Sequence, residues 1–266
     1  MMVDVHCHIL PGLDDGPKTV NDALWMCSIA AEDGISTIVA TPHMLNGIYS
    51  VTPADILAGV QRLNEACRAK NLPIEILPGA DIYIDSDLPR LLADEQLMTV
   101  ANRFGHLMLE LPEESVPAHL HDLLFELQLA GVTPIISHPE RNYAIQQDIH
   151  LLYQLVEAGN LTQITAGALT GQFGSVVQKT ALQITKAGLA HLIATDAHDT
   201  QRRRPVLSQA RKLVEQLLSP EDAELMTSGR ARDIIDGKYV CVPEVEPPRK
   251  KGFFARFVKA PTASGG

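Results

Sequence analysis

The 266-residue chain lacks the features that would direct it into or across a membrane. No apolar run reaches the roughly 18–20 residues of a membrane-spanning helix. The first ten residues, MMVDVHCHIL, have no basic segment and do not resemble a secretory signal peptide. The four cysteines show no paired spacing, which predicts reduced thiols. We therefore expect a cytoplasmic protein.

Several catalytic motifs are also missing. The sequence has no C-x5-R loop of the cysteine phosphatases, and it has neither G-x-x-x-x-G-K-S/T nor G-x-G-x-x-G. It also lacks G-x-S-x-G, H-E-x-x-H and C-x-x-C. These absences leave nucleotide binding of the common types, serine hydrolase chemistry and thiol chemistry without support.

Positive charge is scarce in most of the chain. The net charge is −10, and residues 244–266 contain five basic and two acidic residues, which leaves 17 basic and 30 acidic residues in 1–243. A surface this acidic is a poor ligand for nucleic acid, because binding to phosphate backbones needs basic residues. A phosphorylated substrate would need another source of positive charge in the site, and bound metal ions are the obvious candidate.

Short apolar runs alternate with longer segments of helical periodicity, which predicts an α/β fold built on a parallel sheet, closed or doubly wound. Thr19, Thr52 and Ser115 are predicted helix N-caps, and the first and third of these helices are expected to end at Gly34 and Gly131. Further helices are predicted over 144–158, 174–187, 205–218 and 220–228, and strands over 3–5, 36–40, 74–77, 106–111, 133–137, 161–165 and 191–195.

Metal-ligating residue types gather at the ends of these strands. His6 and His8 leave the first strand as an H-x-H pair whose imidazoles point the same way. Six of the seven predicted strands deliver a His, Asp or Glu at the carboxyl end, where sites form in parallel α/β folds. Imidazole and carboxylate without thiolate suit two or three ions of zinc, manganese or iron. The candidates are His6, His8, Asp15, His43, Asp81, Glu110, His138, Asp196 and His198.

The same residues resemble the PHP (polymerase and histidinol phosphatase) superfamily. More closely, they are similar to its bacterial tyrosine-phosphatase branch, which is associated with capsule and exopolysaccharide synthesis. The resemblance covers roughly residues 2–240. It is carried by H-x-H at 6–8, Asp-Asp-Gly-Pro-Lys at 14–18, Thr-Pro-His at 41–43, Ser-His-Pro-Glu-Arg-Asn at 137–142 and Thr-Asp-Ala-His at 195–198.

This resemblance implies a distorted (β/α)7 barrel with a trinuclear site, usually manganese-dependent. The nine candidates match the family's metal ligands. The family's phosphate-binding arginines match Arg141 and either Arg203 or Arg204. Spacing from His198 favours Arg203, whereas the following Pro205 favours Arg204. One position departs from the family, because Asp81 stands where Glu is usual, and its shorter side chain changes the geometry of a bridged pair.

The resemblance further implies a substrate and a partner. The expected reaction is metal-dependent hydrolysis of phosphotyrosine on the tail of a membrane-bound bacterial tyrosine kinase. Two other functions stay open at this point. One is a small-molecule phosphatase of the histidinol-phosphate type, and the other is a non-catalytic PHP scaffold. Since all nine ligand positions hold metal-capable residues, a decayed site is the least favoured.

The last residues have a composition of their own. We expect a single domain over 1–243 and a basic, flexible tail over 244–266. Within 249–259, Phe253, Phe254, Phe257 and Val258 would share one face of a helix flanked by basic residues. Such a segment is either a disordered tail or a weak contact with an anionic membrane surface or a partner.

Overall fold

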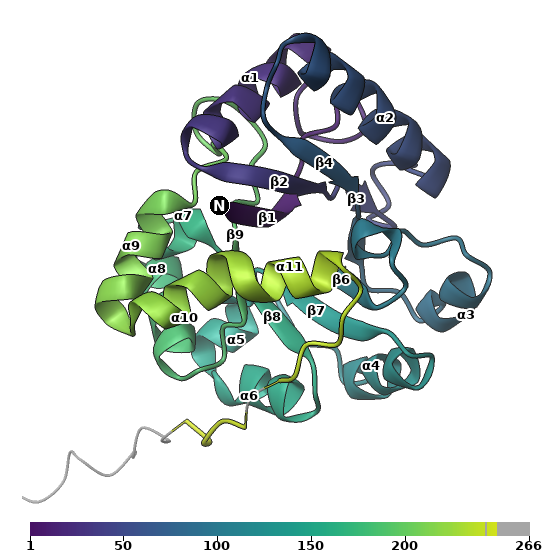
Figure 1. The fold of residues 1–266 in the computed structure, drawn as a ribbon. Coiled ribbons are helices and arrows are strands. Elements are labelled where there is room, and N and C mark those ends of the chain that lie inside the picture. Colours follow the sequence, from purple (N-terminus) through teal and green to yellow (C-terminus); the bar gives the residue numbers. More distant parts are fainter. Residues whose placement is uncertain (243, 249–266) are drawn as a thin grey trace, which may run out of the picture.

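In the computed structural model, which describes residues 1–242 and 244–248, every strand pair is parallel. The strands form a three-stranded sheet and a six-stranded sheet (Figure 1). The smaller sheet has the order β1 (Met2–Cys7), β2 (Ile35–Ala40), β4 (Glu75–Pro78). The larger has the order β3 (His43–Met44), β5 (Asp81–Tyr83), β6 (His106–Glu110), β7 (Thr133–Ser137), β8 (Leu161–Thr165), β9 (Leu192–Ala194).

Two of the predicted strands are followed, after a short break, by a second short strand. Pro42 lies between β2 and β3, and its missing N–H cannot continue a ladder. Gly79 lies between β4 and β5, where a Cβ atom would stand 2.5 Å from Val39 Cγ1. The short strands β3 and β5 beyond the breaks were not predicted, because two and three residues give no periodicity to read.

The outer edges of the two sheets meet beside β1. The backbone N–H of His8 donates to the carbonyl of Ala197 at 2.9 Å, and that of Asp196 donates to the carbonyl of His6 at 2.7 Å. The strand succession therefore returns to its beginning, as in a barrel, although the described ladder is divided into two sheets. The predicted parallel α/β fold is confirmed.

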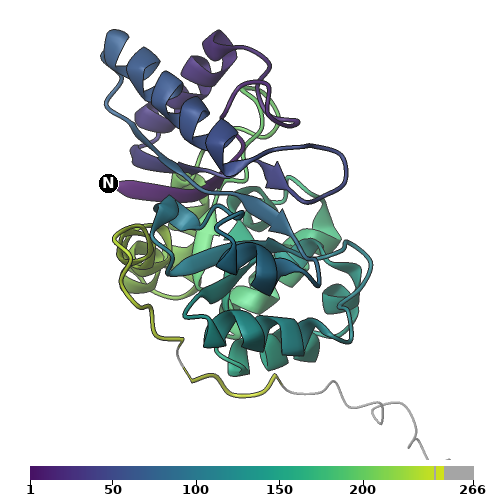
Figure 2. The same ribbon diagram turned by 90° about the vertical axis from the view of Figure 1, so that its right-hand side faces the viewer.

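Two predicted helix starts are confirmed in detail. Helix α1 (Val20–Glu32) begins after Thr19, whose hydroxyl accepts from the Asp22 N–H at 3.2 Å. Helix α2 (Pro53–Ala69) begins after Thr52, and Thr52 and Asp55 form a reciprocal capping box. Figure 1 shows both helices packed on the smaller sheet, and Figure 2 shows most of the remaining helices around the larger one.

Other helix predictions were wrong at their ends. Ser115 caps nothing, because Pro117 favours extended backbone before it and α4 (Leu120–Leu129) begins only after His119. The predicted 144–158 helix is two helices, since Asp148 accepts a hydrogen bond from the His150 N–H and divides them. They are α5 (Tyr143–Gln147) and α6 (His150–Glu157).

The remaining helices complete the outer layer. Helix α8 (Ser175–Lys186) agrees with its prediction, and α9 (Ser208–Leu217) begins three residues after the predicted start. The helix that begins as α10 (Pro220–Glu224) continues through a π-helical turn at Leu225–Gly229 into α11 (Arg230–Ile235), well past its predicted end. The short helices α3 (Leu88–Ala93) and α7 (Ala166–Leu169) were not predicted.

All four cysteines are free in the structure. Among the described residues, no helix has both the length and the apolar character to span a membrane. Val245, in the predicted tail, packs against the core. The boundary at 243 stays a prediction, and the segment 249–259 lies outside the described residues.

A carboxylate from one helix caps another. Asp33, which ends α1, accepts from the N–H groups of Leu207 and Ser208 at 2.7 and 2.9 Å and from the Ser208 hydroxyl at 2.5 Å. Helix α9 has no side-chain cap of its own. Asp33 therefore ties the N-terminus of α9 to the helix layer on the smaller sheet, and its charge suits that helix end.

We expect Asp33→Ala to lower the free energy of unfolding by about 1–3 kcal/mol, because three donors lose a charged acceptor. Chemical denaturation measures the change. Glu32→Ala is the matched control, since its exposed carboxylate accepts only from Ser28 nearby. Equal losses in the two variants would contradict the capping role.

Candidate metal centre

The nine candidate ligands come together at the carboxyl ends of the strands, although they come from both sheets. Three groups of side chains place possible ligand atoms within 4.8 Å of one another. The groups are His8, Asp15, His43, His198; His6, His8, Asp81; and His43, Asp81, Glu110. His138 Nε2 joins them at 3.6 Å from Asp81 Oδ2, and Asp196 Oδ1 joins them at 3.5 Å from His6 Nε2.

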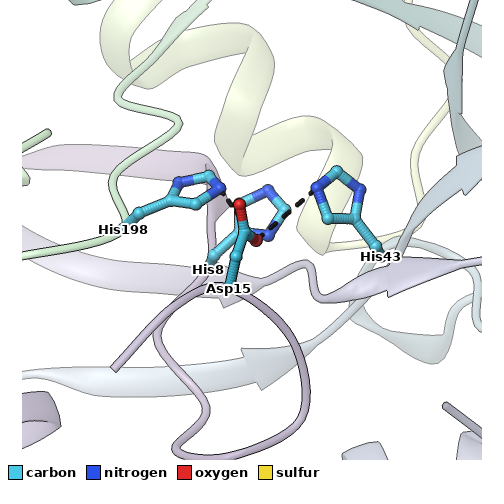
Figure 3. A group of neighbouring side chains, drawn as sticks. All are labelled: His8, Asp15, His43 and His198. Atoms are coloured by element: carbon cyan, nitrogen blue, oxygen red, sulfur yellow. Dashed lines mark ion pairs between the residues drawn. The ribbon is translucent and has the colours of Figure 1, made fainter. Parts of the chain in front are cut away.

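Figure 3 shows the most exposed of these groups. Asp15 Oδ1 lies 3.3 Å from His198 Nε2 and 3.7 Å from His43 Nε2, with the ring of His8 behind it. The Asp15 side chain is 46% exposed, whereas His8 and His198 are buried. The centre is therefore a buried cluster that opens to solvent at Asp15.

Hydrogen bonds on the far ring nitrogens orient three imidazoles. His6 Nδ1 lies 2.8 Å from Gln163 Oε1, and His8 Nδ1 lies 2.7 Å from Asp14 Oδ2. His198 Nδ1 lies 3.0 Å from the carbonyl oxygen of Asp196. These acceptors orient each ring through Nδ1, so that its Nε2 faces the centre, as in metal-bound histidines.

Asp14 and Gln163 were not among the predicted site residues. Asp14 precedes a predicted ligand, so its type and place were visible in the sequence. Gln163 lies on β8, the predicted strand that carries no candidate ligand. Its amide gave no signal, because an amide on a buried strand is not a usual metal ligand.

Several polar atoms of the cluster are buried without a hydrogen-bond partner among the described residues, and this is the observation that suits the cluster to binding cations. Both carboxylate oxygens of Asp81 are buried without a hydrogen-bond partner, and so are His43 Nδ1 and His198 Nε2. The Nε2 atoms of His6 and His8 are 3.2 Å apart. Buried polar atoms that face one another without donors between them are costly unless a cation occupies the space they enclose.

Burial and neighbouring charges shift the pKa values of the clustered side chains. Burial lowers the pKa of His6 to about 4. Burial would also lower the pKa of His8, but hydrogen bonds to Asp14 and Asp196 and their charges raise it to about 10. Burial opposes ionisation of Asp81, yet the neighbouring imidazoles hold the pKa of that carboxyl below its usual range. The buried Asp81 carboxylate therefore stays ionised among the imidazoles that surround it.

Two ligand positions carry left-handed backbone. His138 has φ of 32° and Asp196 has φ of 50°, values that residues other than glycine seldom adopt. His138 follows β7 directly, and Asp196 lies two residues after the end of β9. Such strain persists where surrounding contacts impose it, and here the turn aims each side chain into the centre. Glu140, which follows His138, is buried and accepts from the Thr165 N–H at 2.9 Å.

The two predicted arginines meet at one carboxylate oxygen. Arg141 Nη1 lies 2.8 Å from Asp196 Oδ2, and Arg203 Nη2 also donates to that atom. Both guanidiniums lie over the ring of Phe173, at 5.3 and 5.8 Å from its centroid. Arg203 Nε is buried without a partner, whereas Arg204 lines a separate cavity. The geometry thus favours Arg203 over Arg204 as the partner of Arg141.

We expect Gln163→Met to weaken binding of divalent metal about tenfold, because His6 loses the acceptor that orients it while the core keeps its volume. Gln163 Nε2 has no other partner to lose. Metal competition titration measures the change, with Gln163→Glu as the control that retains an acceptor. Unchanged affinity in Gln163→Met would remove the orienting role.

Known proteins resemble this chain over nearly its whole length. The tyrosine-protein phosphatase YwqE of Bacillus subtilis (strain 168) is 35% identical over 256 residues, which are 96% of this chain and 100% of YwqE. The tyrosine-protein phosphatase CpsB of Streptococcus agalactiae is 27% identical over 246 residues, 90% of this chain and 100% of CpsB.

Solved structures agree. A structure from work on YwqE from Bacillus subtilis and CpsB from Streptococcus pneumoniae, metal-dependent tyrosine phosphatases, matches with a TM-score of 0.90 and 34% identity. The match covers 94% of this chain and 100% of that one. A β-aspartyl dipeptidase from Fervidobacterium islandicum shares the fold alone, at a TM-score of 0.57 and 13% identity over 91% of this chain and 75% of that one. A family model for capsular polysaccharide synthesis, CpsB/CapC, matches residues 2–236, and the chain belongs to the CpsB/CapC family.

Proposed function

We propose that this chain is a metal-dependent tyrosine-protein phosphatase. The observation that carries the proposal is the convergence of nine imidazole and carboxylate side chains beside two arginines at one end of a parallel α/β fold. The activity is that of relatives which the chain matches over most of its length. A cluster of ligands beside guanidinium groups suits hydrolysis of a phosphate ester.

The donor set suggests which ions the centre would hold. Its ligands are imidazoles and carboxylates without thiolate, which suit manganese, iron or zinc. We propose two or three ions, with manganese as the first choice. Asp81 would contribute to two of the three groups and His8 to two, so neighbouring ions would share ligands. When bound, such ions activate water as a nucleophile and neutralise charge on phosphoryl oxygens.

The arginines would bind the phosphoryl group. Each guanidinium uses only part of its five N–H donors on Asp196, and Arg203 Nε has no hydrogen-bond partner among the described residues. The remaining donors stand ready for phosphoryl oxygens, where they stabilise charge in the transition state. Phe173 stabilises both guanidiniums through its ring face. The leaving phenolate of tyrosine has a pKa near 10, so it depends less on a proton donor than an alkyl alcohol does.

The proposed substrate is the phosphotyrosine-bearing tail of a bacterial tyrosine kinase that controls capsule or exopolysaccharide synthesis. Membership of a capsular polysaccharide synthesis family supports this choice. The proposed location is the cytoplasm, at the inner face of the membrane. The basic composition of 249–259 is consistent with a weak contact to anionic lipid, although this segment lies outside the described residues.

The decisive experiment combines metal analysis with turnover of a phosphotyrosine peptide. We expect the purified protein to contain divalent metal and to hydrolyse the peptide. The double variant His6→Ala/His8→Ala should lose at least one metal equivalent and drop in activity by orders of magnitude, because both imidazoles face the centre. Circular dichroism checks that the fold survives.

The chain offers a matched control in its second H-x-H pair. His119 and His121 are exposed at the start of α4, so replacing both with alanine should leave metal content and turnover unchanged. Full activity in the His6→Ala/His8→Ala variant would refute the site. Turnover of histidinol phosphate with none of the peptide would favour a small-molecule phosphatase instead.

We also expect Arg141→Ala and Arg203→Ala each to lower kcat/KM for an aryl phosphate by on the order of 10²-fold with near-normal metal content, because each removes donors from the phosphoryl group. Arg204→Ala should cost less than Arg203→Ala. Arg62→Ala, an exposed arginine on α2, is the control. A loss no larger than that of Arg62→Ala would mean that Arg141 and Arg203 serve only as structural ion-pair partners of Asp196.

A further inference from the structure

A second, positively charged cavity lies beside the arginine pair. It has a volume of about 140 Å³, and its lining includes Arg202, Arg204, Gln172, Gln209 and Thr170. Thr195, which precedes Asp196 in the chain, also lines it, so the cavity adjoins the wall of the metal centre. It is nevertheless a separate cavity, because none of the nine candidate ligands lines it.

Alternating side chains separate the cavity from the arginine pair. Arg203 points toward Asp196, whereas Arg202 and Arg204 on either side of it line the cavity. Neighbouring side chains in the loop before α8 also face different sites. Gln172 lines the cavity, whereas Phe173 lies under the guanidiniums of Arg141 and Arg203. The two sites therefore share walls that are one side chain thick.

Gly167 allows this close arrangement. A Cβ atom there would stand 2.4 Å from Gln172 Oε1 and 3.0 Å from Phe173 Cε2. The Gln172 amide is held in place, because Nε2 donates to the backbone carbonyl of Arg202. The dividing wall is thus fixed from both sides, by α7 and by the loop that carries the arginines.

Among the residues that the structure describes, no carboxylate lines the cavity. In the part of the chain that the structure describes, neither Arg202 nor Arg204 forms an ion pair within 4.0 Å, and both are exposed. The nearby Asp199 uses Oδ1 on the backbone N–H groups of residues 201, 202 and 203, at 2.6, 2.6 and 3.2 Å. Two unpaired guanidiniums in a chain of net charge −10 make this cavity an attractive place for an anion.

We infer that this cavity is a second anion subsite, which binds a carboxylate or phosphoryl group carried by the substrate close to its phosphotyrosine. The inference rests on the proposed phosphatase function. Arginine forms planar, paired hydrogen bonds with either anion, and Gln209 adds an amide donor. The subsite selects phosphotyrosines in acidic or multiply phosphorylated sequences, while Arg141 and Arg203 hold the phosphoryl group that is removed.

The test uses the full-length, metal-loaded protein and peptides of one sequence with a single phosphotyrosine. Alanine, glutamate or a second phosphotyrosine is placed at successive flanking positions. At the position that reaches the subsite, we expect kcat/KM to exceed that of the alanine peptide by about tenfold. The glutamate and phosphotyrosine arms show which anion is preferred.

The variants assign the effect to the cavity. In Arg202→Gln/Arg204→Gln the ratio of kcat/KM between anionic and alanine peptides should fall to about one. Arg202→Lys/Arg204→Lys should keep part of it, and Arg62→Gln should keep all of it. Peptide dissociation constants, measured by fluorescence polarisation, should show the same ratios.

A ratio near one in the unaltered protein at every flanking position, or an unchanged ratio in the double glutamine variant, would overturn the subsite. Anion-dependent binding without any turnover would overturn the phosphatase proposal and leave the subsite standing. Turnover without anion dependence would overturn the subsite and leave the phosphatase proposal standing. The two proposals can therefore fail independently.

Discussion

The Asp196 carboxylate joins the two halves of the site. Its Oδ1 lies 3.5 and 3.4 Å from the Nε2 atoms of His6 and His8, while its Oδ2 accepts from Arg141 and Arg203. The backbone N–H of the same residue donates to the carbonyl of His6. One buried residue therefore contacts the imidazoles of His6 and His8, both guanidiniums and the end of β1.

A network of buried charge needs support from outside it. Asp4, also on β1, is buried and accepts from the Thr195 N–H and hydroxyl at 2.9 and 2.5 Å. Burial raises the pKa of Asp4 to about 7, although these hydrogen bonds act against that rise. Asp14 and Gln163 support the imidazoles in the same manner. The ligands are held by a surrounding layer of hydrogen bonds, as precise geometry at a reactive centre requires.

The convergence of the site could be predicted from the sequence because parallel strands bring their carboxyl ends to one edge. His6, Asp81 and His138 needed only their place after an apolar run to be grouped. The helix caps at Thr19 and Thr52 were equally local and equally visible.

What escaped prediction depends on contacts between distant segments. Gln163 matters only because β8 places it beside His6, 157 positions away in the chain. Asp33 caps a helix whose N-cap residue lies 174 positions later, and no local sequence pattern predicts such a contact. The strands β3 and β5 arise where Pro42 and Gly79 interrupt longer strands, and their pairing is decided by tertiary packing.

The division into two sheets would give the candidate metal centre a role in stability as well as in catalysis. His6 and His8 belong to the smaller sheet and its following loop, whereas Asp81, Glu110 and His138 belong to the larger one. Ions that share ligands from both would act as cross-links between the sheets. The folded state would then gain free energy with rising concentration of free metal, by about 2.7 kcal/mol for one site at a hundred times its dissociation constant. Catalytic competence and resistance to unfolding would depend on the same supply of metal.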